Sequence, residues 1–129
     1  MASAMAGSSR EFLLALPAGI DTARSVVLVL SEVRLPRNAA VVLRARVADR
    51  NTAEIPLGSI GLLAESKTAE GTTLHATLRI DVTKALKRWR QDHPGVGEIH
   101  VRVIPYAGAA PLPDLEWSIG SATLAISGG

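Results

Sequence analysis

The chain has no cysteine and very few aromatic residues, and each shortage excludes a kind of chemistry. Without cysteine there is no disulfide, no thiolate nucleophile and no cysteine-ligated zinc site. Aromatic residues make up 3% of the 129 residues, and they are Phe12, Trp89, Tyr106 and Trp117. Sugar-binding β-sandwiches commonly use exposed aromatic platforms, so this shortage weakens a carbohydrate-binding interpretation.

The chain also lacks a block of like charges and a long apolar segment. Its 14 basic and 12 acidic residues give a net charge of +2, and the basic residues are spread along the sequence, so we expect no nucleic-acid partner. The apolar run from Phe12 to Leu16 is far too short for the core of a signal peptide or for a membrane span. We therefore expect no membrane insertion and, by default, a cytoplasmic protein.

The residues that are present favour one folded domain. Hydrophobic residues, at 47%, outweigh charged residues, at 20%, which is not the composition of a disordered chain. The length suits a single hydrophobic core, and we expect residues 1–10 to form a flexible tail and residues 11–127 to form one domain. A mean hydropathy of +0.23 is high for a small soluble monomer, which predicts that some aliphatic surface is left for a partner.

Short apolar stretches separated by Pro, Gly, Asn and Asp recur along the chain, as they do in antiparallel sandwiches. Pro56, Gly58 and Gly61 interrupt one stretch, which predicts a bent or edge strand there. The predicted strands are Glu11–Leu16, Ser25–Leu35, Val41–Val47, Ile55–Ala64, Leu74–Ile80, Ile99–Pro105 and Leu115–Ser127, with a loop at 107–113 and a kink at Gly120. The fold class is therefore mostly β, an antiparallel β-sandwich of about seven strands with one short α-helix.

That helix is predicted over Val82–Gln91, where Val82, Leu86 and Trp89 recur at helical spacing. Asp81 is placed to act as its N-cap. The opposite side of the helix carries Lys84, Lys87, Arg88 and Arg90. This basic cluster could meet an acidic partner or a membrane surface. A solvated helix face is the interpretation we prefer, because a short helix with its tryptophan in the core is a poor anchor.

Groups suited to catalysis or metal binding are scarce. The chain has three histidines, His75, His93 and His100. His75 and His100 have outward parity in their predicted strands, so a cross-strand metal site is one interpretation and two unrelated surface histidines are the other, which we prefer. No serine lies in a nucleophile-elbow pattern. We predict no catalytic, cofactor-binding or metal-ligating residues and no cofactor, and hence no enzyme activity.

Four stretches give the chain a resemblance to a known family. They are SVVLVLSEVRL (Ser25–Leu35), IPLGSIGLL (Ile55–Leu63), LRIDVTKALKRW (Leu78–Trp89) leading into IHVRVIPYAG (Ile99–Gly108), and WSIGSATLAI (Trp117–Ile126). In this order the chain resembles the C-terminal domain of the tyrosinase/polyphenol oxidase family, especially its bacterial members. The dicopper domain of that family has no counterpart among these residues.

The resemblance implies a β-sandwich that packs over a dicopper oxidase domain, shields the active-site entrance with a side chain from one loop, and is displaced on activation. Our first hypothesis is therefore a non-catalytic shielding domain that docks on a protein partner. Two alternatives stay open. One is a structural or accessory subunit of an unrelated larger complex, since fold does not fix function. The other is a secreted ligand- or carbohydrate-binding module.

Four residues are the candidates for partner docking. Tyr106 and Leu112 are the large side chains of the stiff, proline-rich segment from Pro105 to Asp114, and an aromatic or leucine anchor is a usual source of binding energy. Val42 and Ile104 have outward parity in their strands. The alternative for the segment is an ordinary hairpin connection, with Tyr106 packed on the end of the sandwich.

Overall fold

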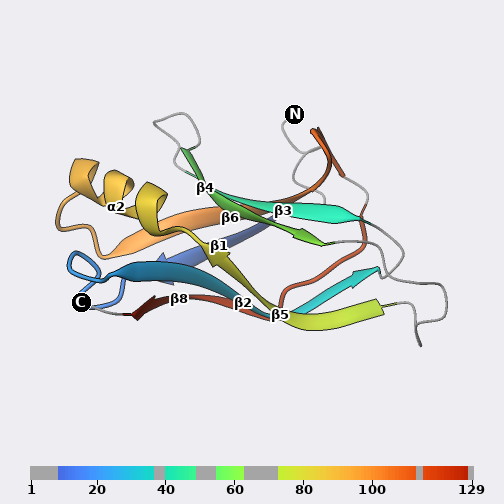
Figure 1. Ribbon diagram of the computed structural model, residues 1–129, viewed down its shortest axis with the longest axis horizontal. Helices are drawn as coiled ribbons and strands as arrows, with labels where there is room; N and C mark the ends of the chain where they lie inside the picture. The colour runs from blue at the N-terminus through green and yellow to red at the C-terminus, as the bar shows by residue number, and fades with distance from the viewer. Residues whose placement is uncertain (1–8, 37–39, 49–54, 63–72, 113–114, 128–129) are drawn as a thin grey trace.

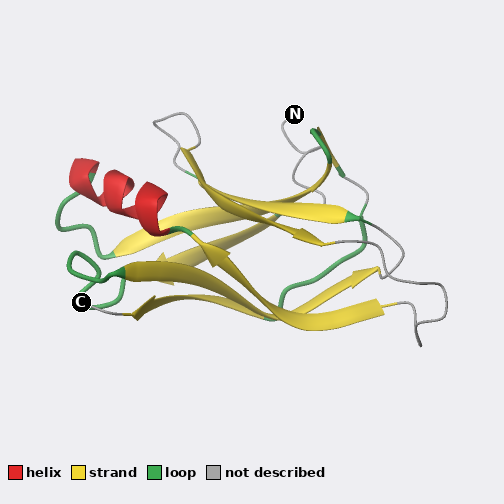
Figure 2. Cartoon of the chain, viewed as in Figure 1, coloured by secondary structure: helices red, strands yellow, loops and turns green. Residues whose placement is uncertain are grey.

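The computed structural model of the chain describes residues 9–36, 40–48, 55–62, 73–112 and 115–127. These residues form eight strands and one short helix, so the predicted mostly-β class is confirmed (Figures 1 and 2). The strands are β1 (Arg10–Ala15), β2 (Ser25–Pro36), β3 (Val41–Val47), β4 (Ile55–Leu62), β5 (Thr73–Asp81), β6 (Glu98–Ala107), β7 (Ala110–Pro111) and β8 (Ser121–Ser127), and the helix is α2 (Thr83–Asp92).

The strands form two antiparallel sheets that face each other. The five-stranded sheet has the order β1-β6-β3-β4, with the two-residue β7 pairing with the end of β6, and the three-stranded sheet has the order β5-β2-β8. Figure 1 shows the two sheets as layers, with α2 at the end of the sandwich where β6 begins. Among the described residues no helix is long and apolar enough to span a membrane.

Strict alternation of side chains explains how the two layers pack. Along β3, Val41, Leu43, Ala45 and Val47 are buried, while the residues between them are half-buried on the outward side. β6 and β2 add further inward residues, and the shared core includes Leu28, Leu30, Val101 and Val103. This single cluster is the core that the alternating pattern predicts.

The edge strand β4 confirms the expectation drawn from its proline and glycines. It pairs only with β3 in the five-stranded sheet, and the register shifts between Ala45 and Arg46. A Cβ atom on Gly58 would lie 2.6 Å from the carbonyl oxygen of Asp81 and 2.9 Å from Cγ2 of Ile80. Gly58 therefore allows β4 and β5 to approach closely, and this approach closes one side of the sandwich.

The last predicted strand is too long. Only Ser121–Ser127 forms β8, and the stretch from Leu115 to Gly120 makes a single bridge, between Arg34 and Ser118. The break coincides with a bulge in β2, where Glu32 has a φ of 52°. The Gly120 N–H donates to the Ser31 carbonyl at 2.9 Å, and a Cβ on Gly120 would lie 2.8 Å from Cβ of Glu32. The glycine is required by this close approach.

The helix begins one residue later than predicted, and Asp81 is not its N-cap. Val82 occupies the N-cap position and makes no side-chain capping bond. Asp81 instead accepts hydrogen bonds from the backbone N–H of Thr83 at 3.0 Å and from its hydroxyl at 2.6 Å. The Thr83 hydroxyl also accepts the backbone N–H of Val26 at 2.9 Å, which fastens the start of α2 to β2. Leu86 and Trp89 are buried as predicted.

The segment predicted as a loop at 107–113 is a small hairpin in its described part. β6 continues through Pro105 to Ala107, and Ala110 and Pro111 pair back onto it. Gly108 has a φ of 62°, which an L-residue rarely adopts, so a glycine suits the turn. The loop prediction failed because alanine, glycine and proline have low strand propensity, whereas pairing with β6 is a tertiary effect.

Candidate docking surface

The four predicted docking residues lie in two different environments. Val42 and Tyr106 are directly opposite each other on β3 and β6, and Ile104 is opposite Arg44 on the same outward side. Tyr106 is only 6% exposed and Ile104 only 5%. Leu112 packs against the core, and its N–H donates to the Pro105 carbonyl at 2.9 Å. Docking through these residues stays a prediction, but burial leaves Tyr106 and Ile104 little surface for a partner.

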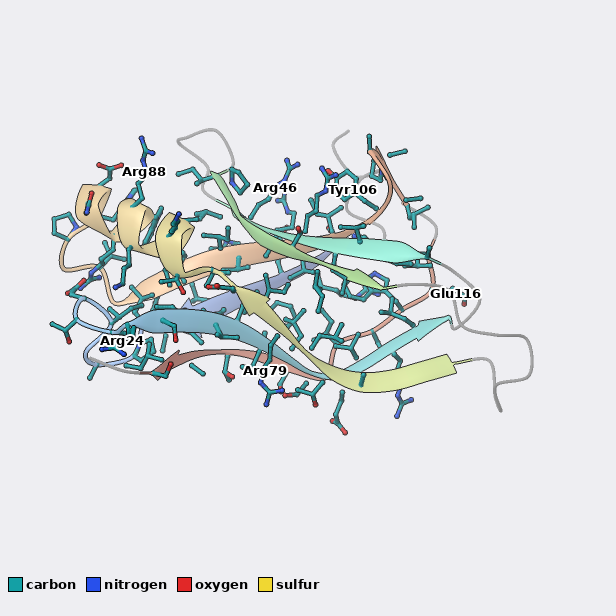
Figure 3. All side chains as sticks on the ribbon, in the orientation of Figure 1. Arg24, Arg46, Arg79, Arg88, Tyr106 and Glu116 are labelled. Carbon is teal, nitrogen blue, oxygen red and sulfur yellow. The ribbon has the colours of Figure 1, made fainter. Side chains whose placement is uncertain are left out.

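Two arginines of β3 stack on Tyr106. The guanidinium carbon of Arg44 lies 4.2 Å from the centre of the tyrosine ring, and that of Arg46 lies 5.9 Å from it. Arg46 also donates to the tyrosine hydroxyl at 3.3 Å, and Arg44 donates to the Gly108 carbonyl at 3.1 Å. Figure 3 shows Arg46 and Tyr106 on the side of the five-stranded sheet that faces away from the other sheet. Two cations are therefore held side by side on one aromatic ring.

A small ion cluster lies next to this stack along the same face. Glu11 of β1 accepts from Nε of Arg102 at 3.0 Å, and its other oxygen lies 2.9 Å from Nε2 of His100. All three side chains are partly exposed, so the cluster adds little stability. The cluster pairs the Glu11 carboxylate with two residues of β6.

An open hollow of about 740 Å³ lies where the outer face of the five-stranded sheet meets the end of α2. Its lining includes Leu13 of β1, His100 of β6, Trp89 and His93 at the end of α2, and Val96 of the following turn. Leu13 is 64% exposed and Val96 is 39% exposed, and they are the exposed large hydrophobic residues of the described chain. Both therefore lie at one site.

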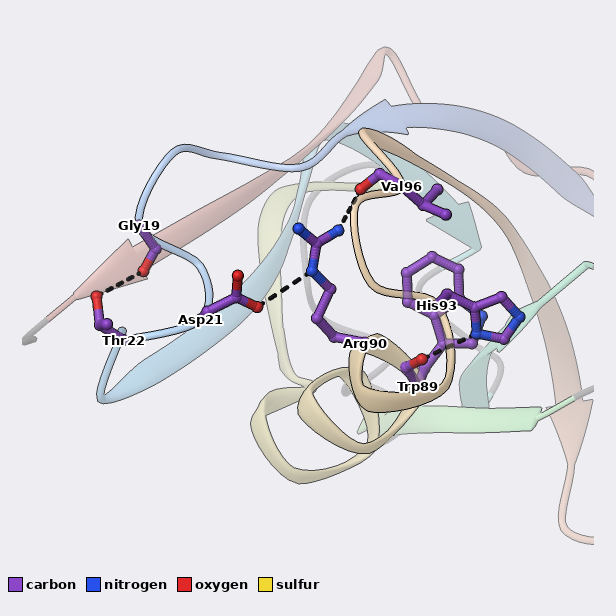
Figure 4. A network of polar contacts seen from close by, with 7 residues as sticks. All are labelled: Gly19, Asp21, Thr22, Trp89, Arg90, His93 and Val96. Atoms are coloured by element: carbon purple, nitrogen blue, oxygen red, sulfur yellow. Dashed lines mark hydrogen bonds and ion pairs between the residues drawn. The ribbon is translucent and has the colours of Figure 1, made fainter.

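The floor and one wall of the hollow are held by contacts within the chain (Figure 4). The rings of Trp89 and His93 stack with their centres 4.5 Å apart, and Nδ1 of His93 lies 2.9 Å from the Trp89 carbonyl oxygen. Arg90 donates to Asp21 at 3.1 Å and also to the Val96 carbonyl. The turn that carries Val96 is thus fastened to the helix.

The cross-strand histidine pair considered as a metal site is wrong. His75 lies on β5 opposite Arg34, in the three-stranded sheet, whereas His100 lies on β6 opposite Leu13, in the five-stranded sheet. Two residues in different sheets are not cross-strand neighbours. Within the described residues, no group of three or more His, Cys, Asp or Glu side chains is placed to hold a metal ion.

The aromatic side chains do not form a platform. Trp89, Tyr106 and Trp117 are buried, and Phe12 is partly buried against the core. A sugar ring would need an exposed aromatic face to stack on, so their burial weighs against the carbohydrate-binding alternative.

Neither Leu13 nor Val96 was predicted to be a docking residue, although each stands out in the sequence. Leu13 is an apolar residue at an outward position between the inward Phe12 and Leu14. Val96 is an apolar residue in a turn otherwise made of proline and glycines. In both places an apolar side chain occupies a position where the local pattern predicts a polar one. This departure from the pattern is the sequence signal that marks the hollow.

Comparison with known proteins adds a likeness in fold. No protein-family model matches the chain, and no curated protein matches it in sequence. The solved structure of latent apple tyrosinase superposes with a TM-score of 0.65 and 16% identity, over 95% of this chain and 26% of that chain. Latent aurone synthase, a polyphenol oxidase, superposes with a TM-score of 0.63 and 12% identity, over 92% of this chain and 24% of that chain.

The chain thus spans about a quarter of the length of these polyphenol oxidases. At such low identities the likeness concerns the fold alone. The likeness in fold to polyphenol oxidases that the sequence resemblance implies is confirmed, and it is consistent with their C-terminal domain. The resemblance to bacterial members in particular stays a prediction. The chain is similar in fold to a quarter-length region of latent tyrosinase-type enzymes.

Proposed function

We propose that the chain is a non-catalytic domain that docks on a protein partner and shields it, and that the partner is a dicopper oxidase domain. One observation carries the proposal. Nearly the whole sandwich, 95% of the chain, superposes on a quarter of an enzyme described as latent, and the remaining three quarters of that enzyme have no counterpart here.

The absence of catalysis is proposed from the sequence. A dicopper centre of the tyrosinase kind uses about six histidine ligands, because imidazole suits copper. This chain has three histidines in all and no cysteine. With His75 and His100 in separate sheets, they are dispersed as well as too few. The purified chain is therefore expected to oxidise no phenol or catechol, with or without added copper.

Shielding requires only that the docked sandwich keep substrate away from the copper site. A rigid domain can do this with no chemistry of its own, because it blocks the entrance as long as the interface holds. The proposal therefore depends on a surface with enough apolar and charged groups for a stable interface. The outer face of the five-stranded sheet offers such groups in Leu13 and the arginines on Tyr106, and the adjoining turn after α2 adds Val96.

The proposal is tested by purifying the affinity-tagged chain at its natural level from the organism that makes it. We expect it to elute as a complex larger than the 13.5 kDa chain, with stoichiometric copper and with catechol oxidation that rises when the chain is stripped off. Elution of the chain alone, or in a stoichiometric complex without copper, would contradict the proposed partner. The second result would instead favour an accessory subunit of an unrelated complex.

A further inference from the structure

The hollow at the end of α2 is the apolar part of a larger surface. Leu13 and Val96 expose their side chains there, above the stacked rings of Trp89 and His93. Well-packed pockets that accept one apolar anchor are where binding energy concentrates in protein interfaces. The helix end and the Arg90 contacts hold this hollow in shape, which reduces the ordering cost of binding.

The arginine stack is the charged part of the same surface. Arg44 and Arg46 alternate on the outward side of β3, so both guanidinium groups lie on one face. Within the described part of the chain, Arg44 forms no ion pair, and it contacts the Tyr106 ring and the Gly108 carbonyl. A guanidinium group stacked on a ring, as that of Arg44 is, can bind a carboxylate through its planar edge with charge-assisted hydrogen bonds.

The two parts have a fixed order along β6. Leu13 is opposite His100, whereas Arg44 is opposite Ile104 and Val42 is opposite Tyr106. A separation of four to six residues along a strand corresponds to about 13–20 Å. The charge between them is balanced, because Glu11 is paired with Arg102 and His100. Glu98 is an exposed carboxylate at the hollow, so a carboxylate of the partner belongs at the arginine end.

We propose that this outer β1–β6–β3 face binds a segment of the partner protein that places an apolar side chain in the hollow and a carboxylate on Arg44. The inference rests on the proposed function for the existence of a partner, and it adds the surface and the chemistry of the segment that binds there. An extended segment with about four to six residues between its apolar and acidic side chains fits the spacing.

The experiment places a photo-crosslinking residue at Leu13 or, as a control on the other sheet, at Val29, in the full chain expressed in its source organism. Both positions accept a changed side chain without disturbing the core, since Leu13 is exposed and Val29 is outward on β2. We expect crosslinking from position 13 and not from position 29. The crosslinked peptide of the partner should contain a large apolar residue with Asp or Glu about four to six residues away.

Substitutions provide the second readout. Leu13→Ser combined with Val96→Ser should reduce the recovered complex at least about tenfold, and Arg44→Gln should reduce it several-fold. Val29→Ser and Arg79→Gln, on the outward side of the three-stranded sheet, should leave it within about twofold. The thermal midpoint of each variant should stay that of the unchanged chain, so a lost complex cannot be attributed to unfolding.

The outcomes separate the two proposals. A copper-containing partner that crosslinks from position 29, or that survives the Leu13 and Val96 substitutions, overturns the docking face and leaves the proposed function standing. A copper-free partner that crosslinks only from position 13, through a peptide of the expected kind, supports the docking face and contradicts the dicopper partner. Absence of any crosslinked partner contradicts both.

Discussion

The two sheets present very different outer faces, although both follow the same alternation of inward and outward residues. The outer face of the three-stranded sheet carries small, β-branched or hydroxyl side chains, such as Val29, Thr123 and Ala125, together with the exposed Arg34 and Arg79. Figure 3 shows Arg79 on this side of the molecule. The outer face of the five-stranded sheet carries the exposed Leu13 and, further along, Tyr106 with two arginine side chains over its ring.

This difference shows that parity fixes the side on which a residue lies and not its function. A solvated sheet face needs only small or polar residues, as the three-stranded sheet has. Large side chains on an outward face form a second layer, in which Tyr106 and Ile104 become buried and Leu13 stays exposed. The extra layer is what we expect of a face that meets another protein.

The largest loss of stability is expected from truncating Trp89, which forms the floor of the hollow. Trp89 is 5% exposed, and Trp89→Ala should lower the free energy of unfolding by about 3–5 kcal/mol because it leaves a large cavity. Trp89→Phe is the matched control, since it keeps most of the volume and removes an indole N–H that has no acceptor among the described residues. Urea unfolding measures both, and a loss below about 1 kcal/mol for the alanine variant would show that Trp89 is not a floor.

A direct comparison of the two faces comes next. Tyr106→Ala should cost about 2–4 kcal/mol, because a buried ring and its arginine contacts are lost. Val29→Ala, at an outward position of the other sheet, should cost less than about 1 kcal/mol. Chemical denaturation of the two variants under the same conditions measures the difference. Equal losses would remove the distinction between the faces.

A smaller loss of stability is expected at Gly58, where β4 and β5 approach each other closely. Gly58→Ala should cost about 1–3 kcal/mol, because the new methyl group would collide with the backbone of Asp81. Gly97→Ala is the control, since apart from its chain neighbours no described residue has an atom within 4 Å of a Cβ built there. Thermal unfolding of the pair checks this. A neutral Gly58 variant would mean that β4 and β5 can separate without cost.

The smallest expected effect is on the stability of the fold at acid pH. Hydrogen bonds from the Thr83 hydroxyl and backbone N–H lower the pKa of Asp81 below its ordinary value of 3.8. A carboxyl group with a lowered pKa in the folded state stabilises the fold at pH values above its unfolded pKa. That contribution is lost as the pH falls through the folded pKa. Between pH 5 and pH 2, the thermal midpoint of Asp81→Asn should fall less than that of the unchanged chain, and parallel curves would contradict the link to the start of α2.

The sequence predicts most of the fold because the main strands alternate strictly and are bounded by glycine or proline. β3 and the buried side of α2 were expected from periodicity alone, and the close approach at Gly58 from a glycine inside a strand. The hairpin at Ala110 and the single bridge at Ser118 were not expected. Both depend on pairing between segments distant in the sequence, which local propensity does not contain.

The candidate surface was predictable only in part. Outward parity correctly placed Val42 and Ile104 on one face. Parity does not predict how deeply a side chain is buried, and Ile104 is buried. The hollow combines Leu13 with Val96, which lie in segments 83 residues apart that meet only in the fold. Both apolar residues can be identified in a single sequence, but their closeness in space cannot.

The most direct measurement of the account is the rate of catechol oxidation by the dicopper partner as the purified chain is added. The account predicts that the rate falls toward zero as the chain reaches a one-to-one ratio with the partner. It also predicts that the Leu13→Ser, Val96→Ser double variant fails to inhibit while Val29→Ser inhibits as the unchanged chain does. A rate that is unaffected by saturating chain, or that both variants suppress equally, would contradict the account.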